Sequence, residues 1–153
     1  MMQRLELRLP PVLIVLAAAL AMWLAAHWLP ALAVPALPAW AALIPVIGGL
    51  GCMLASIAAF RRARTTANPM TPGAASVLVT GGIYRVTRNP MYLGLALGLT
   101  GWALYLGNLG ALMLVPGFVF FLTRFQILPE ERALQARFGA TYASYRRRVR
   151  RWI

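Results

Sequence analysis

The stretch GGIYRVTRNPMYLG, residues 81–94, joins a polar loop to a long apolar run. Asn89 and Pro90 predict that a helix starts at this junction, because Asn is a preferred N-cap residue and Pro is favoured at the first helical position. The free N–H groups and the positive dipole end of that helix would lie beside Arg85 and Arg88. Such a place suits an anion at the edge of an apolar compartment. The stretch alone also fits a simpler interpretation, in which it starts a transmembrane helix and its arginines set the orientation of that helix.

The composition is that of an integral membrane protein. The chain has 153 residues, one domain's worth, of which 61% are hydrophobic and 12% are charged. Fifteen basic residues, all of them arginine, face three acidic ones, and the net charge is +12. Because the arginines flank apolar runs, the positive-inside rule and anionic lipid headgroups explain this charge better than nucleic acid does. The single Cys52 excludes an intrachain disulfide and argues against a cysteine metal cluster, so no metal site is expected.

Four apolar runs are long enough to cross a bilayer as helices, and they cover about residues 10–28, 40–60, 91–106 and 109–125. The first run could also be a signal peptide, although no cleavage site leads into a hydrophilic mature chain. Gly94, Gly98 and Gly101 lie along one face of the third run, which indicates a tight helix contact or room for a ligand. Gly107 and Asn108 predict a tight turn, so the last two runs should form a helical hairpin.

The placement of the arginines predicts the orientation. They lie before the first run, between the second and third runs, and from the end of the fourth run onward, and the other two connections carry none. Both termini are therefore expected in the cytoplasm, with four crossings of a membrane such as a bacterial inner membrane. The predicted fold is a single all-α membrane domain, residues 1–153, with a helix hairpin and amphipathic cytoplasmic tail helices. No charge is expected at mid-membrane, which argues against an ion or proton pathway.

Two of the three acidic residues follow directly after the fourth run. Pro129, Glu130 and Glu131 predict the first turn of an amphipathic helix, which Gly139 is suited to end. The helix dipole explains one glutamate readily, but explains two poorly in a chain that otherwise avoids carboxylates.

A second amphipathic segment begins at Thr141 and contains Tyr142 and Tyr145. It ends in the arginine cluster of residues 146–151, which we expect to lie on anionic lipid, each arginine contributing about 1 kcal/mol. This tail and residues 81–94 fall on the same predicted side of the membrane, because the intervening hairpin returns the chain to that side.

The pairing of RVTRNPMYLG with EERALQARFGATYASYRRRVRR resembles the isoprenylcysteine carboxyl methyltransferase family and the related phospholipid methyltransferases, some of which carry the Asn-Pro-Met-Tyr step. The resemblance covers about residues 65–153. It implies an integral membrane enzyme that moves a methyl group from S-adenosylmethionine to a lipophilic acceptor, with the cofactor in a pocket closed by the C-terminal region. Asn89 stands where the carboxyl methyltransferases have His, and an amide cannot carry charge or relay a proton.

The resemblance implies that the cofactor is bound from both motifs, by Tyr84, Arg88, Asn89, Tyr92, Glu130, Glu131, Tyr142 and Tyr145. The chemistry of the cofactor agrees, because Arg88 with the helix N-terminus can take its carboxylate and a glutamate can accept from both ribose hydroxyls. Arg88 and Asn89 are the best candidates for positioning at the reaction centre. Methyl transfer needs alignment and exclusion of water more than acid–base groups.

The acceptor stays open among a prenylcysteine carboxylate, a phospholipid amine, a thiol and a quinone-like hydroxyl, arriving from the bilayer beside the third run. Two functions of other classes compete with the enzyme: a non-enzymatic scaffold or lipid-binding subunit, and a small transporter. The missing mid-membrane charge disfavours the transporter. The Glu130–Glu131 pair distinguishes the enzyme from the scaffold, because a ribose-binding site uses such a pair and a scaffold does not.

Overall fold

The computed structural model describes residues 10–34, 37–65 and 77–153. The main helices are α1 (Pro11–Trp28), α2 (Ala39–Arg62), α3 (Pro90–Leu106), α4 (Leu109–Leu122) and α5 (Leu128–Arg148). Shorter helical turns are η2 (Pro30–Leu32), η4 (Gly82–Arg85) and the π-helical η5 (Thr123–Ile127). No strand longer than an isolated bridge occurs in these described ranges. The predicted all-α fold is confirmed. The charged leader before residue 10 and the loop over 66–76 lie outside the described residues.

Three helical stretches are long and apolar enough to cross a membrane. They are α1, α2 and the continuous stretch Leu109–Arg148, whose apolar part is α4. Helix α3 is also apolar but has 17 residues. At 1.5 Å per residue it is about 26 Å long, slightly less than a hydrocarbon core of about 30 Å. The four predicted runs therefore match four helices, while four complete crossings stay a prediction.

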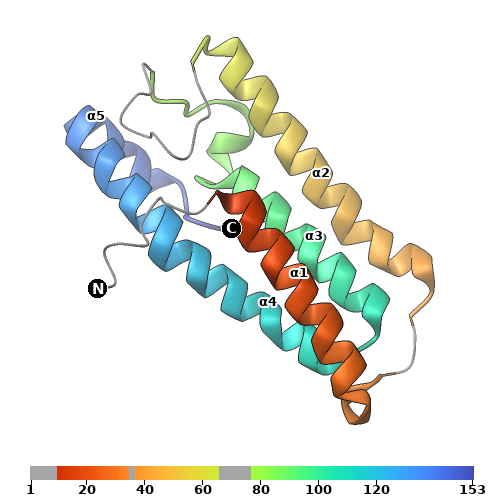
Figure 1. The fold of residues 1–153 in the computed structure, drawn as a ribbon. Coiled ribbons are helices and arrows are strands. Elements are labelled where there is room, and N and C mark those ends of the chain that lie inside the picture. The colour runs from red at the N-terminus through yellow and green to blue at the C-terminus, as the bar shows by residue number, and fades with distance from the viewer. Residues whose placement is uncertain (1–9, 35–36, 66–76) are drawn as a thin grey trace.

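The turn between α3 and α4 forms as predicted. Gly107 ends α3 in the left-handed conformation, with φ 57°, which glycine adopts without strain. Asn108 caps α4 by accepting a hydrogen bond from the N–H of Ala111, and its amide donates to the carbonyl of Leu29 at 3.0 Å. The hairpin is thereby tied to the end of α1. Figure 1 shows α1 to α4 side by side, with α5 extending beyond the end of α4.

Helices α2 and α3 approach closely because two glycines of α3 lack side chains. A Cβ added to Gly94 would lie 2.6 Å from the carbonyl oxygen of Gly49, and one added to Gly101 would lie 2.6 Å from that of Ala42. Around Gly98 there is no atom within 4 Å of such a Cβ. The small-residue face of α3 therefore serves helix contact at two positions and leaves space at the third.

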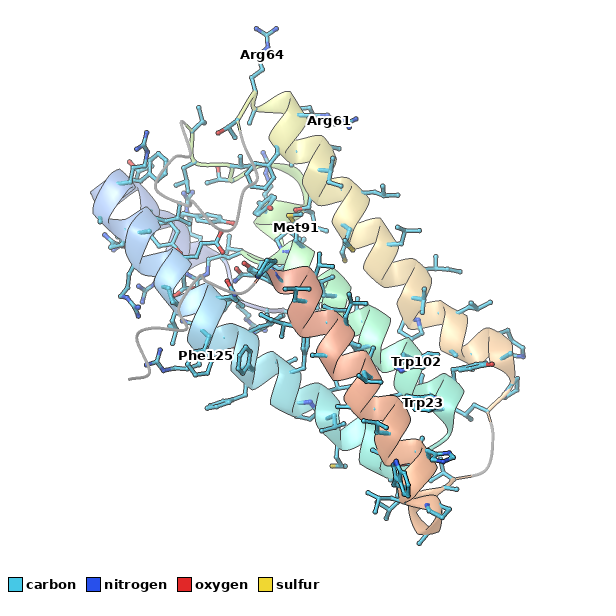
Figure 2. The ribbon with its side chains drawn as sticks, in the orientation of Figure 1. Trp23, Arg61, Arg64, Met91, Trp102 and Phe125 are labelled. Carbon is cyan, nitrogen blue, oxygen red and sulfur yellow. The ribbon has the colours of Figure 1, made fainter. Side chains whose placement is uncertain are left out.

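One end of the bundle carries the charged residues. Arg61 and Arg64 are exposed at the end of α2 and extend away from the bundle, at the end where η4 and α5 lie (Figures 1 and 2). Helix α5 is interrupted at Gly139, whose backbone has φ 50° and ψ −123°. This break separates the two predicted amphipathic segments.

Replacing Gly94 by Ala should destabilise the protein by about 1–3 kcal/mol, because the added methyl group meets backbone that has no room to move. Gly98→Ala, on the same helix, is the matched control and should be neutral or stabilising by up to about 1 kcal/mol. Thermal unfolding of both variants in mild detergent measures the difference. Equal effects of the two substitutions would contradict the close α2–α3 contact.

Candidate functional site

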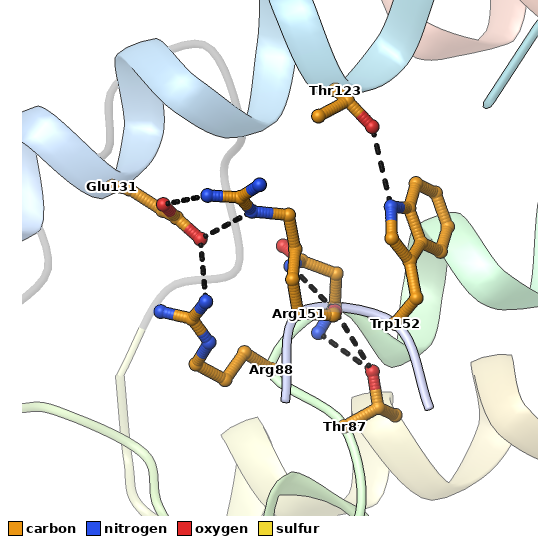
Figure 3. Close-up of polar contacts among 7 residues, drawn as sticks. Thr87, Arg88, Thr123, Glu131, Arg151 and Trp152 are labelled. Carbon is orange, nitrogen blue, oxygen red and sulfur yellow. Dashed lines mark hydrogen bonds and ion pairs between the residues drawn. The ribbon is translucent and has the colours of Figure 1, made fainter. Parts of the chain in front are cut away.

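A buried carboxylate shared by two arginines stands at the centre of the charged end. Arg88 Nη2 lies 3.1 Å from Glu131 Oε1. Arg151 binds the same carboxylate with two hydrogen bonds, from Nε to Oε1 at 3.0 Å and from Nη2 to Oε2 at 2.9 Å. The side chains of Arg88 and Glu131 are 9% and 7% exposed, and that of Arg151 is 32% exposed. Figure 3 shows the two arginines reaching Glu131 from separate segments of the chain.

Arg88 keeps donors that no described residue accepts. Its Nε and Nη1 are buried and have no hydrogen-bond partner in the described part of the chain. Buried polar groups are almost always paired, so an unpaired, buried guanidinium edge calls for a ligand or ordered water. The cluster of Arg88, Glu131 and Arg151 carries one excess positive charge. The missing partner is therefore expected to be an anion.

The second glutamate has a different environment. Tyr92 donates its hydroxyl hydrogen to Glu130 Oε2 at 3.1 Å. Burial, and to a smaller extent the neighbouring Glu131, raise the pKa of Glu130 to about 7, although the Tyr92 hydrogen bond opposes the rise. Its other oxygen, Oε1, accepts no hydrogen bond from the described residues. Glu130 is thus a carboxyl group with acceptor capacity to spare and a proton that it can hold near neutral pH.

Three predicted tyrosines pack α5 against η4 and the end of α2. Tyr145 donates to the backbone carbonyl of Tyr84 at 2.7 Å, and the Tyr84 hydroxyl lies 2.6 Å from Ser56 Oγ. The rings of Tyr142 and Tyr145 are 6.3 Å apart, in the same buried cluster. Burial raises the pKa of Tyr142 to about 12 and also raises the pKa of Tyr84 and Tyr145, so all three phenols stay neutral. The hydroxyls of Tyr84 and Tyr145 already have partners within the protein.

Asn89 occupies the N-cap position of α3, as predicted, but its side chain makes no capping hydrogen bond. The predicted helix start at Asn89 and Pro90 is therefore confirmed, although the side-chain bond that usually makes Asn a favoured N-cap is absent. Its amide instead donates to the carbonyl of Arg151 at 3.0 Å, which satisfies a backbone group of the C-terminal segment. The Asn89 N–H donates to Thr87 Oγ1 at 3.2 Å.

Arg151 is a residue that the sequence reasoning missed. The arginine cluster 146–151 was expected to lie on lipid as a whole, and for Arg151 this is wrong because its guanidinium is bound to Glu131. No feature of the run RRRVRR marks Arg151 apart from its neighbours. The shortage of carboxylates in the sequence could have indicated such a contact. Where few glutamates lie near many arginines, one buried glutamate can be expected to pair with more than one arginine.

The structure brings the two predicted motifs to one end of the bundle. Tyr92 meets Glu130, Arg88 meets Glu131, and Tyr84 meets Tyr145. A cleft of about 480 Å³ runs along a face of α5, and polar lining residues are Glu131, Arg132, Gln135, Arg146 and Arg151. Its volume is in the range of sites for small ligands, about 300–1,000 Å³. Of the predicted binding residues, Glu131 alone lines this cleft.

Comparison with known proteins gives one family and one relative. A family model described as "Phospholipid methyltransferase" matches residues 37–141, about two-thirds of the chain. A protein of Haemophilus influenzae described as uncharacterized is 44% identical over 63 residues, which are 41% of this chain and 100% of that protein. No solved structure matches the chain. The matched region contains both predicted motifs up to Thr141, and Tyr142, Tyr145 and Arg151 lie beyond it.

The raised pKa of Glu130 predicts a pH-dependent stability. Because the folded state binds this proton more tightly than the unfolded state, the stabilisation is fully present below pH 4.5 and is lost as the pH rises to about 7. The unfolding temperature of the wild type should therefore fall over this interval relative to that of Glu130→Gln, which lacks the titrating group. The two proteins share every other titratable residue. Parallel curves of unfolding temperature against pH would show that Glu130 does not hold the proton.

Proposed function

Since this chain belongs to the phospholipid methyltransferase family, we propose that it is an integral membrane methyltransferase that takes its methyl group from S-adenosylmethionine and passes it to a lipophilic acceptor. The observation that carries the cofactor assignment is the buried guanidinium of Arg88, which is paired with Glu131 and keeps two donors unpaired among the described residues. A non-enzymatic scaffold has no use for unpaired buried donors, which cost stability.

Arg88 is proposed to bind the carboxylate of the cofactor. Its Nη2 can stay on Glu131 while Nε and Nη1 face the new anion, so binding would satisfy donors that are otherwise orphaned. Helix α3 begins at Pro90, two residues beyond Arg88, and the positive end of its dipole adds to the attraction. The excess positive charge of the cluster favours an anion for the same reason.

Of the two glutamates, Glu130 is the better partner for the ribose. A carboxylate has about four lone-pair sites. Glu131 already accepts hydrogen bonds from Arg151 on both oxygens and is shared with Arg88, whereas Glu130 accepts from Tyr92 alone among the described residues. Hydrogen bonds from two ribose hydroxyls would stabilise the charged form of Glu130 and lower its pKa from about 7. Tyr92 would hold the carboxyl group in orientation.

S-adenosylmethionine, when bound, supplies an electrophilic methyl group whose bond to sulfur breaks as the bond to the acceptor forms. The residues of this chain have to align the two reactants and exclude water. The neutral tyrosines and the apolar start of α3 suit that task. We propose that the acceptor, similar to a prenylcysteine carboxylate or a phospholipid amine, enters from the bilayer beside α3, where Gly98 leaves space.

The orientation of the protein in the membrane follows from the distribution of its arginines, which fall on one predicted side. We propose four crossings with both termini in the cytoplasm and with the exposed Arg147 and Arg148 against anionic headgroups. Reporter fusions test this: a fusion at Asn108 should read external, and one after Arg64 or at the C-terminus should read cytoplasmic. A cytoplasmic signal at Asn108 would contradict the hairpin as a pair of membrane crossings.

Arg88→Ala should weaken the binding of S-adenosylhomocysteine, the cofactor product, about tenfold or more, because a hydrogen bond to a charged group contributes about 1.5–3 kcal/mol. Arg147→Ala is the control, since it removes the same charge from an exposed position of α5. Calorimetric titration of both variants in lipid nanodiscs gives the two dissociation constants. Equal losses would mean that general positive charge, and not a site, attracts the ligand.

The acceptor can be identified directly. Purified protein is incubated with methyl-labelled S-adenosylmethionine and total membrane lipid, and the labelled product is analysed by mass spectrometry. Label in a lipid fraction, lost in Arg88→Ala, is the expected result. If the folded wild type binds no S-adenosylhomocysteine and labels nothing, the scaffold takes the place of the enzyme.

A further inference from the structure

We propose that Arg151 is a positioning residue of the cofactor site, which keeps Arg88 available for an anion by holding Glu131 away from full pairing with it. The inference rests on the proposed function, because the anion in question is the cofactor carboxylate. Arg151 lies outside the region that the family model matches. It is the last residue of the second motif, where the sequence alone predicts contact with lipid and not a place in the site.

The backbone of Arg151 is fixed on the side of the first motif. After α5 ends, Val149 is extended, with φ −124° and ψ 133°, and the chain runs beside Thr87 in a parallel bridge at Arg150. The Arg88 N–H donates to the carbonyl of Arg150 at 3.0 Å. The carbonyl of Arg151 accepts from Thr87 Oγ1 at 3.2 Å and from Asn89 Nδ2 at 3.0 Å.

The residue after Arg151 provides a second anchor. Trp152 donates its indole N–H to Thr123 Oγ1 at 3.2 Å, in the π-helical turn between α4 and α5 (Figure 3). The C-terminal segment is thus bound to the start of α3 and to the end of α4. These contacts fix the backbone of Arg151 at a place from which its guanidinium reaches Glu131.

Charge and geometry show what this placement does. With Arg151 present, both oxygens of Glu131 accept from Arg151, and Arg88 holds one of them through Nη2. Two guanidinium groups share one carboxylate, so a positive charge is left over and Arg88 Nε and Nη1 remain unpaired among the described residues. Without Arg151, Glu131 could turn both oxygens toward Arg88 in the bidentate arrangement that arginine and carboxylate prefer. Arg88 would then be neutralised by its own neighbour.

The test is the affinity for S-adenosylhomocysteine of the full chain in lipid nanodiscs. Arg151→Gln should weaken binding about tenfold or more, because it removes the charge that holds Glu131. Arg150→Gln is the matched control: it deletes the same charge one residue away but keeps the backbone carbonyl that pairs with Arg88. It should change the dissociation constant about twofold or less, the range for sites that do not interact. Arg151→Lys keeps the charge but not the bidentate geometry, so its dissociation constant should lie between those of Arg150→Gln and Arg151→Gln.

A double-mutant cycle with Glu131→Gln separates positioning from a general structural role. If Arg151 acts through Glu131, the loss caused by Arg151→Gln should shrink to about twofold or less once Glu131 is Gln, since no carboxylate is left to restrain. Independent, additive losses would overturn the inference, as would wild-type affinity in Arg151→Gln. If Arg151→Gln does not fold, Arg151→Lys carries the same cycle. Failure of the wild type itself to bind would refute the proposed function, which is a distinct result.

Discussion

A buried carboxylate keeps its charge only when ion pairs or hydrogen bonds replace the water it has lost, and Glu131, 7% exposed, takes two arginine partners from distant parts of the chain. Arg88 comes from the segment that precedes α3, and Arg151 comes from the segment that follows α5. The hairpin of α3 and α4 brings Arg88 and Glu131 to the same end of the bundle, and the chain after α5 brings Arg151 to the same carboxylate. The left-handed Gly107, the cap made by Asn108 and the break at Gly139 are the local conditions for that path.

The described helices at the charged end pack together although most of the charge there has one sign. The tyrosine cluster fixes α5 against η4 and α2 through neutral hydrogen bonds, which add no charge. The two acidic groups in the described part of the chain both lie at the candidate site. Glu131 pairs with the two arginines, and Glu130 accepts a hydrogen bond from Tyr92 alone among the described residues. A ligand with a carboxylate at one end and a diol at the other fits that division of tasks.

Much of the fold could be predicted from the sequence. Apolar runs bounded by Pro, Gly and Arg gave the ends of α1, α2 and α3 to within a few residues, because length and hydrophobicity decide membrane helices. The motifs that meet at the site were predicted from the segments around Arg88 and Glu131, which carry recognisable residue patterns. Arg151 and the Asn89 amide could not be predicted. Both depend on where the extended chain after Val149 runs in three dimensions. The five arginines of the cluster 146–151 carry no local signal of which one turns inward. The π-helical turn that places Thr123 within hydrogen-bond distance of Trp152 has no recognisable sequence pattern either.

The central claim is that Nε and Nη1 of Arg88 bind the carboxylate of the cofactor while Arg151 stays hydrogen-bonded to Glu131. An experimentally determined structure of the protein with S-adenosylhomocysteine in lipid nanodiscs tests it most directly. The account predicts a ligand carboxylate within hydrogen-bond distance of Arg88 Nε or Nη1, the ribose hydroxyls on Glu130, and both Glu131 oxygens still on Arg151. A ligand bound elsewhere, with Arg88 still paired to Glu131 alone, would contradict it.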